Sequence, residues 1–328
     1  MKPVLARTFR SAFLALLLVY FQPVDLTAAE TMMTIGSGNI TGVYYGTSSA
    51  VAKMHNKKRK NYGVWLASQS TAGSLENING VLQNNFDFGI AQSSAMSQAW
   101  NGHEIWGNVP KSDLRAVLGL HTEAVTLIAA ADAGIMSLKD LKGKRVNIGA
   151  PGSSDHQTSN TILKMLGLNI EEDMTVSRFP TYEASEKIQT GDIDAYFYTV
   201  GHPNLSVIEA SAGERKMHIV PFDQEIINNL KSVADYLSET EIGIKYYENL
   251  MNEEPVSTIG IKAILFTHVG TNDEVVYRIV KQVVENIDLF RRQHPAFSKL
   301  AAEKMSQDTI VPLHPGAERY FKEAGIIQ

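Results

Sequence analysis

Apolar and polar positions alternate in a regular way from about residue 31 onward. Short apolar runs of strand length are followed by stretches in which apolar residues recur every three or four positions, the spacing of an amphipathic helix. A repeated strand and helix predicts parallel strands with crossover helices, and therefore an α/β fold. The first strand–helix pairs are expected at 32–36 with 43–56, 64–68 with a helix from Ser74, and 86–91 with 95–101.

A second unit of the same kind begins near residue 138. It is expected to hold a short helix at 138–144, strands at 145–149, 175–179, 195–199 and 218–221, and helices at 157–166, 182–189 and 224–237. Further strands are expected at 114–120, 124–130 and 256–266, and a strongly amphipathic helix at 275–290.

Two similar lobes follow from this repetition. The run at 256–266 is long enough to cross back to the first unit, so the first lobe is expected at 30–122 with about 267–328, and the second at about 123–266. A chain of 328 residues can supply a hydrophobic core to each of two lobes.

The loops that follow the predicted strands are rich in glycine, hydroxyl and amide residues. Because the carboxyl ends of parallel strands lie at one edge of a sheet, these loops should meet in a cleft between the lobes. The loop Gly36–Gly42 leads into a helix at Val43, and a helix N-terminus attracts anions. The sequence therefore predicts an anion site at this edge.

Most candidate ligand contacts in these loops are neutral hydrogen-bond donors, which can hold a carboxylate without lysine or arginine. Some of the hydroxyls could instead cap helices. Asp155 could accept a hydrogen bond from a ligand ammonium or hydroxyl, or cap its own helix, and His202 could contact a ligand or fix its loop. The neutral candidates include Ser37, Asn39, Tyr44, Thr71, Ser74, Gln92, Ser93, Ser153 and Ser154.

Motifs for cofactor, metal or catalytic sites are not found. The spacing of Gly36, Gly38 and Gly42 suggests a dinucleotide loop, but no acidic residue lies between Gly42 and Glu76 to bind a ribose. The chain has no cysteine, no P-loop, no Gly-x-Ser-x-Gly elbow and no His-Glu-x-x-His motif. We therefore expect no cofactor, no metal and no catalytic residues.

The N-terminus has the pattern of a secretory signal peptide. Basic residues precede a run of about ten apolar residues at 12–21, and small residues around Ala29 suggest a cleavage site. An uncleaved anchor is the alternative, although a spanning helix needs roughly 20 apolar residues. We expect residues 1–29 to be removed and the mature protein to be exported to the periplasm.

The overall charge is acidic. Removal of residues 1–29 changes the formal net charge from −5 to −7, because three basic residues and one acidic residue are lost. No basic stripe occurs beyond Lys57–Lys60, so nucleic acid is not an expected partner.

The sequence resembles the TAXI-type solute receptors of tripartite ATP-independent periplasmic (TRAP) transporters. The resemblance covers nearly all of the mature chain, in order. It is carried by Ile35-Gly-Ser-Gly38 with Gly42-Val-Tyr-Tyr45, Thr71-Ala-Gly-Ser-Leu-Glu-Asn77, Asp87-Phe-Gly-Ile-Ala-Gln-Ser93, Leu141-Lys-Gly-Lys-Arg-Val146 with Gly149-Ala-Pro-Gly-Ser153, and Pro312-Leu-His-Pro-Gly-Ala-Glu-Arg-Tyr320.

The resemblance implies a protein that is not an enzyme. It implies a type II periplasmic-binding-protein fold that closes over a small organic acid and delivers it to membrane permease subunits. The hinge would then lie near 121–126 and 256–266, and the protein would be a monomer. The ligand-binding residues that the resemblance implies are Ser37, Gly38, Asn39, Tyr44, Thr71, Gly73, Ser74, Gln92, Ser93, Ser153 and Ser154.

Two positions depart from related patterns. The fourth loop reads Pro-Gly-Ser-Ser-Asp155, whereas Pro-Gly-Ser-Gly-Thr is usual in similar proteins. The other class of TRAP receptor uses an arginine where Asn147 stands here. Carboxylate capture would therefore depend on neutral donors and helix ends.

The resulting prediction is a binding protein for a C4 or C5 dicarboxylate such as 2-oxoglutarate, or for glutamate. An exported enzyme on the same fold is one alternative. A sensor partner that reports ligand occupancy to a membrane kinase is another.

Overall fold

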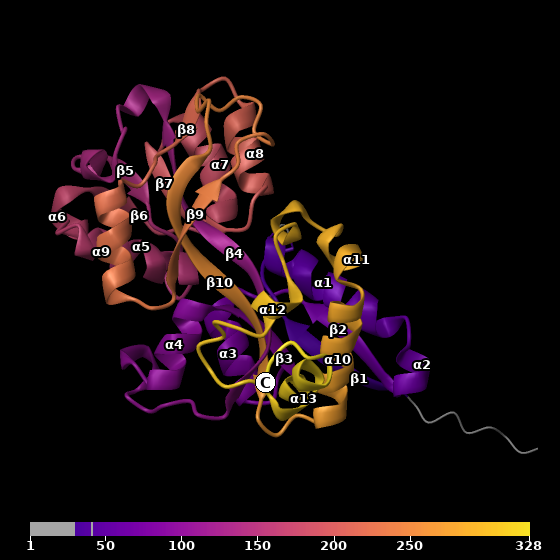
Figure 1. The fold of residues 1–328 in the computed structure, drawn as a ribbon. Helices are drawn as coiled ribbons and strands as arrows, with labels where there is room; N and C mark the ends of the chain where they lie inside the picture. Colours follow the sequence, from indigo (N-terminus) through magenta and orange to yellow (C-terminus); the bar gives the residue numbers. More distant parts are fainter. Residues whose placement is uncertain (1–29, 41) are drawn as a thin grey trace, which may run out of the picture.

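The computed structural model describes residues 30–40 and 42–328 (Figure 1). The predicted signal peptide, residues 1–29, lies outside this part of the chain. Within the described part, no helix is both long and apolar enough to cross a membrane.

A single sheet of ten strands runs through the molecule, in the order β2-β1-β3-β10-β4-β7-β5-β6, with β8 beside β4 and β9 beside β10. The strands are β1 (Thr31–Gly36), β2 (Val64–Gln69), β3 (Phe88–Gln92), β4 (Leu114–Ala130), β5 (Arg145–Asn147), β6 (Thr175–Ser177), β7 (Ala195–Val200), β8 (Met217–Ile219), β9 (Leu237–Ile242) and β10 (Val256–His268).

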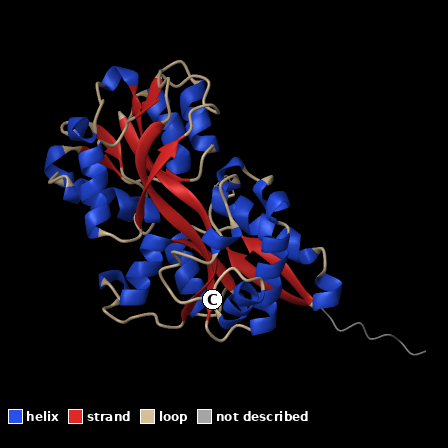
Figure 2. Cartoon of the chain, in the orientation of Figure 1, coloured by secondary structure: helices blue, strands red, loops and turns tan. Residues whose placement is uncertain are grey.

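Helices cover both faces of this sheet (Figure 2). The α-helices are α1 (Val43–Asn56), α2 (Arg59–Tyr62), α3 (Ser74–Leu82), α4 (Ser93–Asn101), α5 (Ser154–Met165), α6 (Ile170–Asp173), α7 (Thr181–Thr190), α8 (Leu205–Ala212), α9 (Gln224–Val233), α10 (Asp273–Glu285), α11 (Ile287–Arg291), α12 (Ala302–Met305) and α13 (Pro315–Glu323). Short 3-10 helices are η1 (Glu104–Trp106), η2 (Ala131–Ala133), η3 (Leu138–Leu141) and η4 (Pro295–Phe297).

The sheet has two halves with the same strand arrangement. In one half β1 lies between β2 and β3 and pairs parallel with both. In the other half β5 lies between β6 and β7, again parallel. The long strands β10 and β4 pair antiparallel with each other and with β3 and β7, so they join the halves through the middle of the molecule (Figure 1).

Each half has hydrophobic clusters on both faces of its part of the sheet. In the first half, one cluster joins Ile35 and Val51 to Val280 and Phe321, and another surrounds Phe266. In the second half, separate clusters include residues of α5 and α9 and residues of α7 and α8. Strands covered on both faces explain why the sequence shows continuous apolar runs rather than strict alternation.

Helix α10 shows how local sequence sets these elements. The Asn272 side chain accepts hydrogen bonds from the backbone N–H groups of Glu274 and Val275, which satisfies donors in the first turn. Val276, Val280 and Val283 recur at helical spacing and are buried against the sheet.

Most predicted elements are confirmed, and three of them differ in their extent; helices such as α8 and α13 were not predicted. The runs 114–120 and 124–130 form the single strand β4, because His121 and Glu123 are buried within it and do not mark a turn. The helix expected to end at 237 ends at Val233, and β9 follows. The helix expected at 275–290 is divided at Asn286 into α10 and α11.

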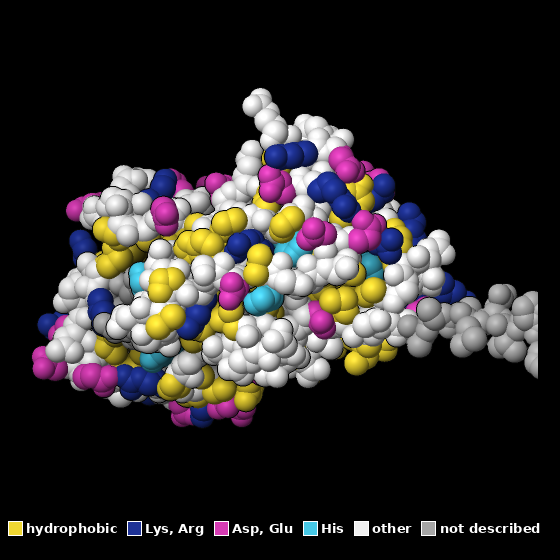
Figure 3. All heavy atoms as spheres, turned by 90° about the horizontal axis from the view of Figure 1, so that it is seen from below, with side chains coloured by type: hydrophobic (Ala, Val, Ile, Leu, Met, Phe, Trp, Pro, Cys, Tyr) yellow, Lys and Arg dark blue, Asp and Glu magenta, His cyan; other side chains and the backbone are white. Residues whose placement is uncertain are grey.

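On the face seen in Figure 3, lysine and arginine side chains lie among aspartate and glutamate side chains. Neither sign of charge occupies a wide continuous area of that face.

Candidate ligand-binding site

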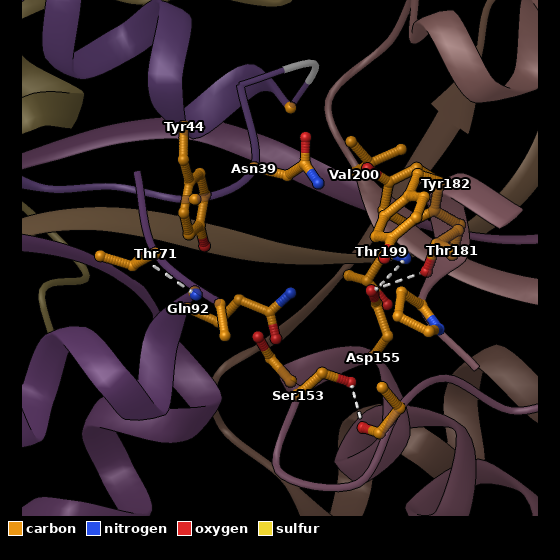
Figure 4. Close-up of a pocket in the computed structure, with 18 of the residues that line it drawn as sticks. Asn39, Tyr44, Thr71, Gln92, Ser153, Asp155, Thr181, Tyr182, Thr199 and Val200 are labelled. Atoms are coloured by element: carbon orange, nitrogen blue, oxygen red, sulfur yellow. Dashed lines mark hydrogen bonds between the residues drawn. The ribbon is translucent and has the colours of Figure 1, made fainter. Parts of the chain in front are cut away.

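A cavity of about 460 Å³ lies between the two halves, at the carboxyl ends of their parallel strands. Its size falls within the range of small-molecule sites. Figure 4 shows Asn39, Tyr44, Thr71 and Gln92 on one side, and Ser153, Asp155 and Thr181 on the other. The predicted cleft between lobes is therefore present.

Five helices begin at the wall of this cavity. The residues that precede their first turns all line it: Gly42 before α1, Gly73 before α3, Gln92 before α4, Ser153 before α5 and Pro180 before α7. Only Ser153 caps its helix with its side chain, by accepting from the His156 N–H at 3.1 Å. Among the described residues, no side chain caps the N-termini of α1, α3, α4 and α7. The first turns of α3 and α7 contain Glu76 and Glu183, whereas those of α1 and α4 contain no acidic residue, so the positive dipole ends of α1 and α4 are the most available to an anion.

Most of the predicted binding residues line the cavity. They lie at or after the carboxyl ends of β1, β2, β3 and β5, as the sequence pattern indicates. They are Gly38, Asn39, Tyr44, Thr71, Gly73, Gln92, Ser153, Ser154 and Asp155.

Four predicted residues lie off the cavity wall and use their polar groups inside the protein. The Ser37 hydroxyl donates to the Gln69 carbonyl at 2.6 Å, and the Ser93 hydroxyl to the Tyr236 carbonyl at 3.5 Å. His202 shares hydrogen bonds with Thr126 at 2.8 Å and with Tyr247 at 2.5 Å. The geometry therefore gives no support to ligand contacts from Ser37, Ser93 or His202.

The fourth of these residues, Ser74, connects the two sides of the cleft. Its hydroxyl accepts from the Gln92 N–H at 3.1 Å and from the Ser154 hydroxyl at 3.1 Å. The second bond joins α3 of the first half to α5 of the second. Ser74 thus acts in the structure as a contact between halves, beside the cavity.

Several lining residues were missed by the sequence interpretation. Those with polar or aromatic side chains are Glu123, Thr181, Tyr182, Tyr198, Thr199 and Ser206. One signal was available for Glu123, since an acidic residue between two apolar runs is unusual inside a strand.

Glu123 is 3% exposed and stands on β4. Its carboxylate accepts from the Tyr44 hydroxyl at 2.7 Å. Burial raises the pKa of Glu123 to about 8, and the nearby Asp155 charge adds to this, while hydrogen bonds from Tyr44 and Gln92 oppose it. Glu123 is therefore largely protonated at neutral pH in this conformation.

Asp155 lies in the first turn of α5 and is half-buried. Its carboxylate accepts from the Thr199 N–H at 2.9 Å and from the Thr181 hydroxyl at 3.2 Å. Burial raises the pKa of Asp155 to about 6, against the effect of these two hydrogen bonds. Asp155 therefore ties α5 to β7 and α7 at the edge of the cavity.

No lysine or arginine is found among the described residues that line the cavity. Asn147, where the other TRAP receptor class has arginine, is buried away from the cavity and exchanges hydrogen bonds with the Phe179 backbone at 3.1 and 3.2 Å. Among the same described residues, no group of three His, Asp or Glu side chains is placed to hold a metal ion.

The comparisons with known proteins agree with this architecture. Residues 35–325 match the NMT1-like family. The chain belongs to the NMT1-like family. This match spans both halves of the sheet and every loop at the cavity wall.

Solved structures similar to this NMT1-like chain share its fold. The periplasmic binding protein BugD is 12% identical with a TM-score of 0.54, over 90% of this chain and 98% of that one. A structure described as a periplasmic transporter is 14% identical with a TM-score of 0.54, over 90% and 92%. A protein of Bordetella bronchiseptica RB50 is 19% identical with a TM-score of 0.50, over 90% and 89%. The predicted α/β periplasmic-binding-protein fold is thereby confirmed.

Proposed function

We propose that this protein is an extracytoplasmic solute-binding protein that captures a small carboxylate and delivers it to a membrane transporter. The observation that carries the proposal is a cavity at whose wall five helices begin, four of which have no side-chain cap among the described residues. Unpaired N–H groups and dipole ends can neutralise a carboxylate where no basic side chain is present. The names of two of the similar structures, a periplasmic binding protein and a periplasmic transporter, support a role in capture.

The proposed moving units are the lobes expected from the sequence, 30–122 with about 267–328, and about 123–266. The strands β4 and β10 carry the chain from one lobe to the other and are paired by hydrogen bonds. We therefore propose a hinge near 121–126 and 256–266. A ligand that contacts both lobes binds the closed form more tightly than the open form and so shifts the population toward closure.

We further propose that the transporter is of the TRAP type and that the ligand is a C4 or C5 dicarboxylate such as 2-oxoglutarate, or glutamate. The transporter class rests on the sequence resemblance to TAXI-type receptors. In this proposal the protein acts as a periplasmic monomer that meets permease subunits in the membrane.

A thermal-shift screen of dicarboxylates, oxo acids and amino acids tests the capture of a carboxylate. A ligand that binds only the folded protein, present at 100 times its Kd, adds about 2.7 kcal/mol to the free energy of unfolding. Neutral diamides of the same acids, at matched ionic strength, are the control and should not shift the midpoint. If no carboxylate raises the midpoint, the proposed function is wrong.

One observation favours an enzyme as the second candidate. Glu123 is a buried carboxyl in a cleft with a strongly raised pKa, which is also a property of general acids and bases. Each acid that shifts the melting midpoint should therefore be incubated with the protein and followed by NMR. Recovery of the unchanged acid favours binding over catalysis, and conversion would favour the enzyme.

A further inference from the structure

Glu123 stands at the point where β4 passes from one half of the molecule to the other. Its neighbours in the antiparallel register are Ile261 on β10 and, one position along β4, Ala124 beside Val200 of β7. The carboxyl lines the cavity and is almost closed to solvent, with 3% exposure. A titratable group at this position changes environment when the lobes separate.

Among the described residues, no positively charged group acts on Glu123. Tyr44 of α1 donates to it at 2.7 Å, Gln92 at the end of β3 hydrogen-bonds to it, and Asp155 of α5 and Tyr198 of β7 interact with it electrostatically. Burial lowers the pKa of His121, two positions earlier on β4, to about 3, so His121 is neutral.

The nearest lysine along the paired strand is directed elsewhere. Lys262 of β10 lies opposite Thr122, and its ammonium donates to the carbonyls of Lys304 and Gln307 at 2.7 and 2.6 Å. The carboxyl of Glu123 therefore has no cationic partner within the described residues that could keep it ionised beside an anionic ligand.

An anionic ligand in the cavity adds negative charge beside two carboxyl groups. Like charges in a space of low dielectric disfavour ionisation, and a proton on one of the groups removes the repulsion. Asp155 is the less suitable proton acceptor, because both of its oxygens accept hydrogen bonds from protein donors. Glu123 instead accepts hydrogen bonds from side chains, from the Tyr44 hydroxyl at 2.7 Å and from Gln92, and not, among the described residues, from the backbone N–H of a neighbouring strand as Asp155 does.

We propose that Glu123 takes up a proton from solvent when the lobes close over an anionic ligand and releases it when they open. This inference rests on the proposed function, since it requires a carboxylate ligand. Ligand capture and proton uptake are then linked, and Glu123 makes the affinity for the ligand dependent on pH.

The sign of the effect follows from the two conformations. An exposed glutamate has a pKa of about 4.3, whereas burial raises the pKa of Glu123 to about 8 in this closed arrangement. Between these values closure binds a proton, so the affinity is higher at the acidic end and falls as the pH rises. The limit is about tenfold in Kd for each pH unit, and the fall ends above about pH 8.

Titration calorimetry on the full chain with 2-oxoglutarate and, in parallel, glutamate tests the inference between pH 6.5 and pH 8. This range lies above the value of about 6 to which burial raises the pKa of Asp155. We expect Kd to increase by at least about threefold across the range, within the tenfold-per-unit limit. At pH 7, the binding enthalpies measured in buffers of different ionisation enthalpy should show a net uptake of protons on binding.

Three variants assign the effect to this residue. Glu123→Gln keeps a neutral side chain of the same shape, and its Kd should be the same at both ends of the range. Glu241→Gln removes an equal charge from an exposed position on β9 and should keep the wild-type pH profile. Tyr44→Phe removes one of the two hydrogen bonds that oppose the raised pKa of Glu123, so the pH above which Kd stops increasing should be higher than in the wild type.

The possible outcomes are distinct. Binding with a flat pH profile, or affinity that increases with pH as for a ligand ammonium paired with an ionised Glu123, overturns the inference and leaves the proposed function intact. Absence of binding of any carboxylate at any pH overturns both. Because the buffer series uses the wild-type chain, the result does not depend on whether a variant folds.

Discussion

Asp155 and Glu123 line the same cavity but are held in different ways. The Asp155 carboxylate accepts hydrogen bonds from two protein donors on separate elements, the Thr199 N–H and the Thr181 hydroxyl. Glu123 has a tyrosine hydroxyl as its partner and little exposure to solvent. At the scale of the residue, one carboxyl is a structural link and the other is a group whose charge can change.

We therefore expect Asp155→Ala to act on stability more than on the choice of ligand. The change leaves the Thr199 N–H without its acceptor, which costs about 1–3 kcal/mol in the free energy of unfolding. Urea denaturation should show a lower midpoint at unchanged slope. The affinities for glutamate and 2-oxoglutarate should decrease by similar factors.

A selective loss of glutamate binding in Asp155→Ala would contradict this interpretation. It would show instead that Asp155 accepts a hydrogen bond from the ligand ammonium. Asp155→Asn provides the matched comparison, because its side-chain oxygen can still accept from Thr199 while the charge is gone.

At the scale of the element, the start of α5 is set by a loop with little freedom. Gly149 has φ of +91°, and a Cβ there would lie 2.9 Å from the backbone nitrogen of His156 in the first turn of α5. Gly152, in the same loop, has φ of +83° but open space around its α-carbon. A side chain at Gly152 would therefore meet only the cost of the positive φ, whereas a side chain at Gly149 would meet that cost and a steric contact.

Gly149→Ala should therefore destabilise the protein more than Gly152→Ala. Alanine at a positive φ costs of order 1–3 kcal/mol at either site, and the contact with His156 adds to this cost only at Gly149. Denaturant unfolding of both variants measures the difference. Equal losses would show that the loop moves to admit the added methyl group.

The strand–loop–helix units could be predicted because their signals are local. The glycines and hydroxyls between β1 and α1 end one element and begin the next, whatever the rest of the chain does. Strand β9 could not be predicted in the same way, since Leu237-Ser-Glu-Thr-Glu-Ile242 has few apolar residues and is extended because it pairs with β10.

The prediction of the site residues was limited for the same reason, because local sequence does not contain the contacts made by distant segments. The pattern identified loops at the cavity, but it could not show which side chains in them point inward. Ser37 and Ser93 donate to backbone carbonyls away from the cavity, whereas Ser153 lines the cavity although its hydroxyl donates to the Ala150 carbonyl at 2.7 Å. Glu123, Thr181 and Tyr198 reach the cavity through the packing of distant segments, and no local pattern contains that information.

At the scale of the whole molecule, the two halves touch across the cleft through a pair of hydroxyls. Ser74 on α3 and Ser154 on α5 lie 3.1 Å apart between oxygens. The chain contains no cysteine, so an engineered disulfide at this pair would have no competing thiol. The pair therefore offers a direct test of whether opening is needed for exchange of the ligand.

We expect Ser74→Cys combined with Ser154→Cys to form a disulfide that holds the lobes closed. Ligand bound before oxidation should then dissociate at least about tenfold more slowly, because release requires opening. Reductant should restore the wild-type rate, and each single variant is the control. Unchanged release from the oxidised protein would contradict closure as the basis of retention.

The core of the first half joins the two ends of the described chain. Ile35 and Val51 pack in one cluster with Val280 and Phe321, so this cluster needs residues separated by more than two hundred positions. During synthesis the strands of the second half can pair before the C-terminal residues that complete the core of the first half have been made. A chain interrupted before α10 would expose the apolar faces of β1 and α1, which makes truncated or slowly completed copies targets for proteolysis and aggregation.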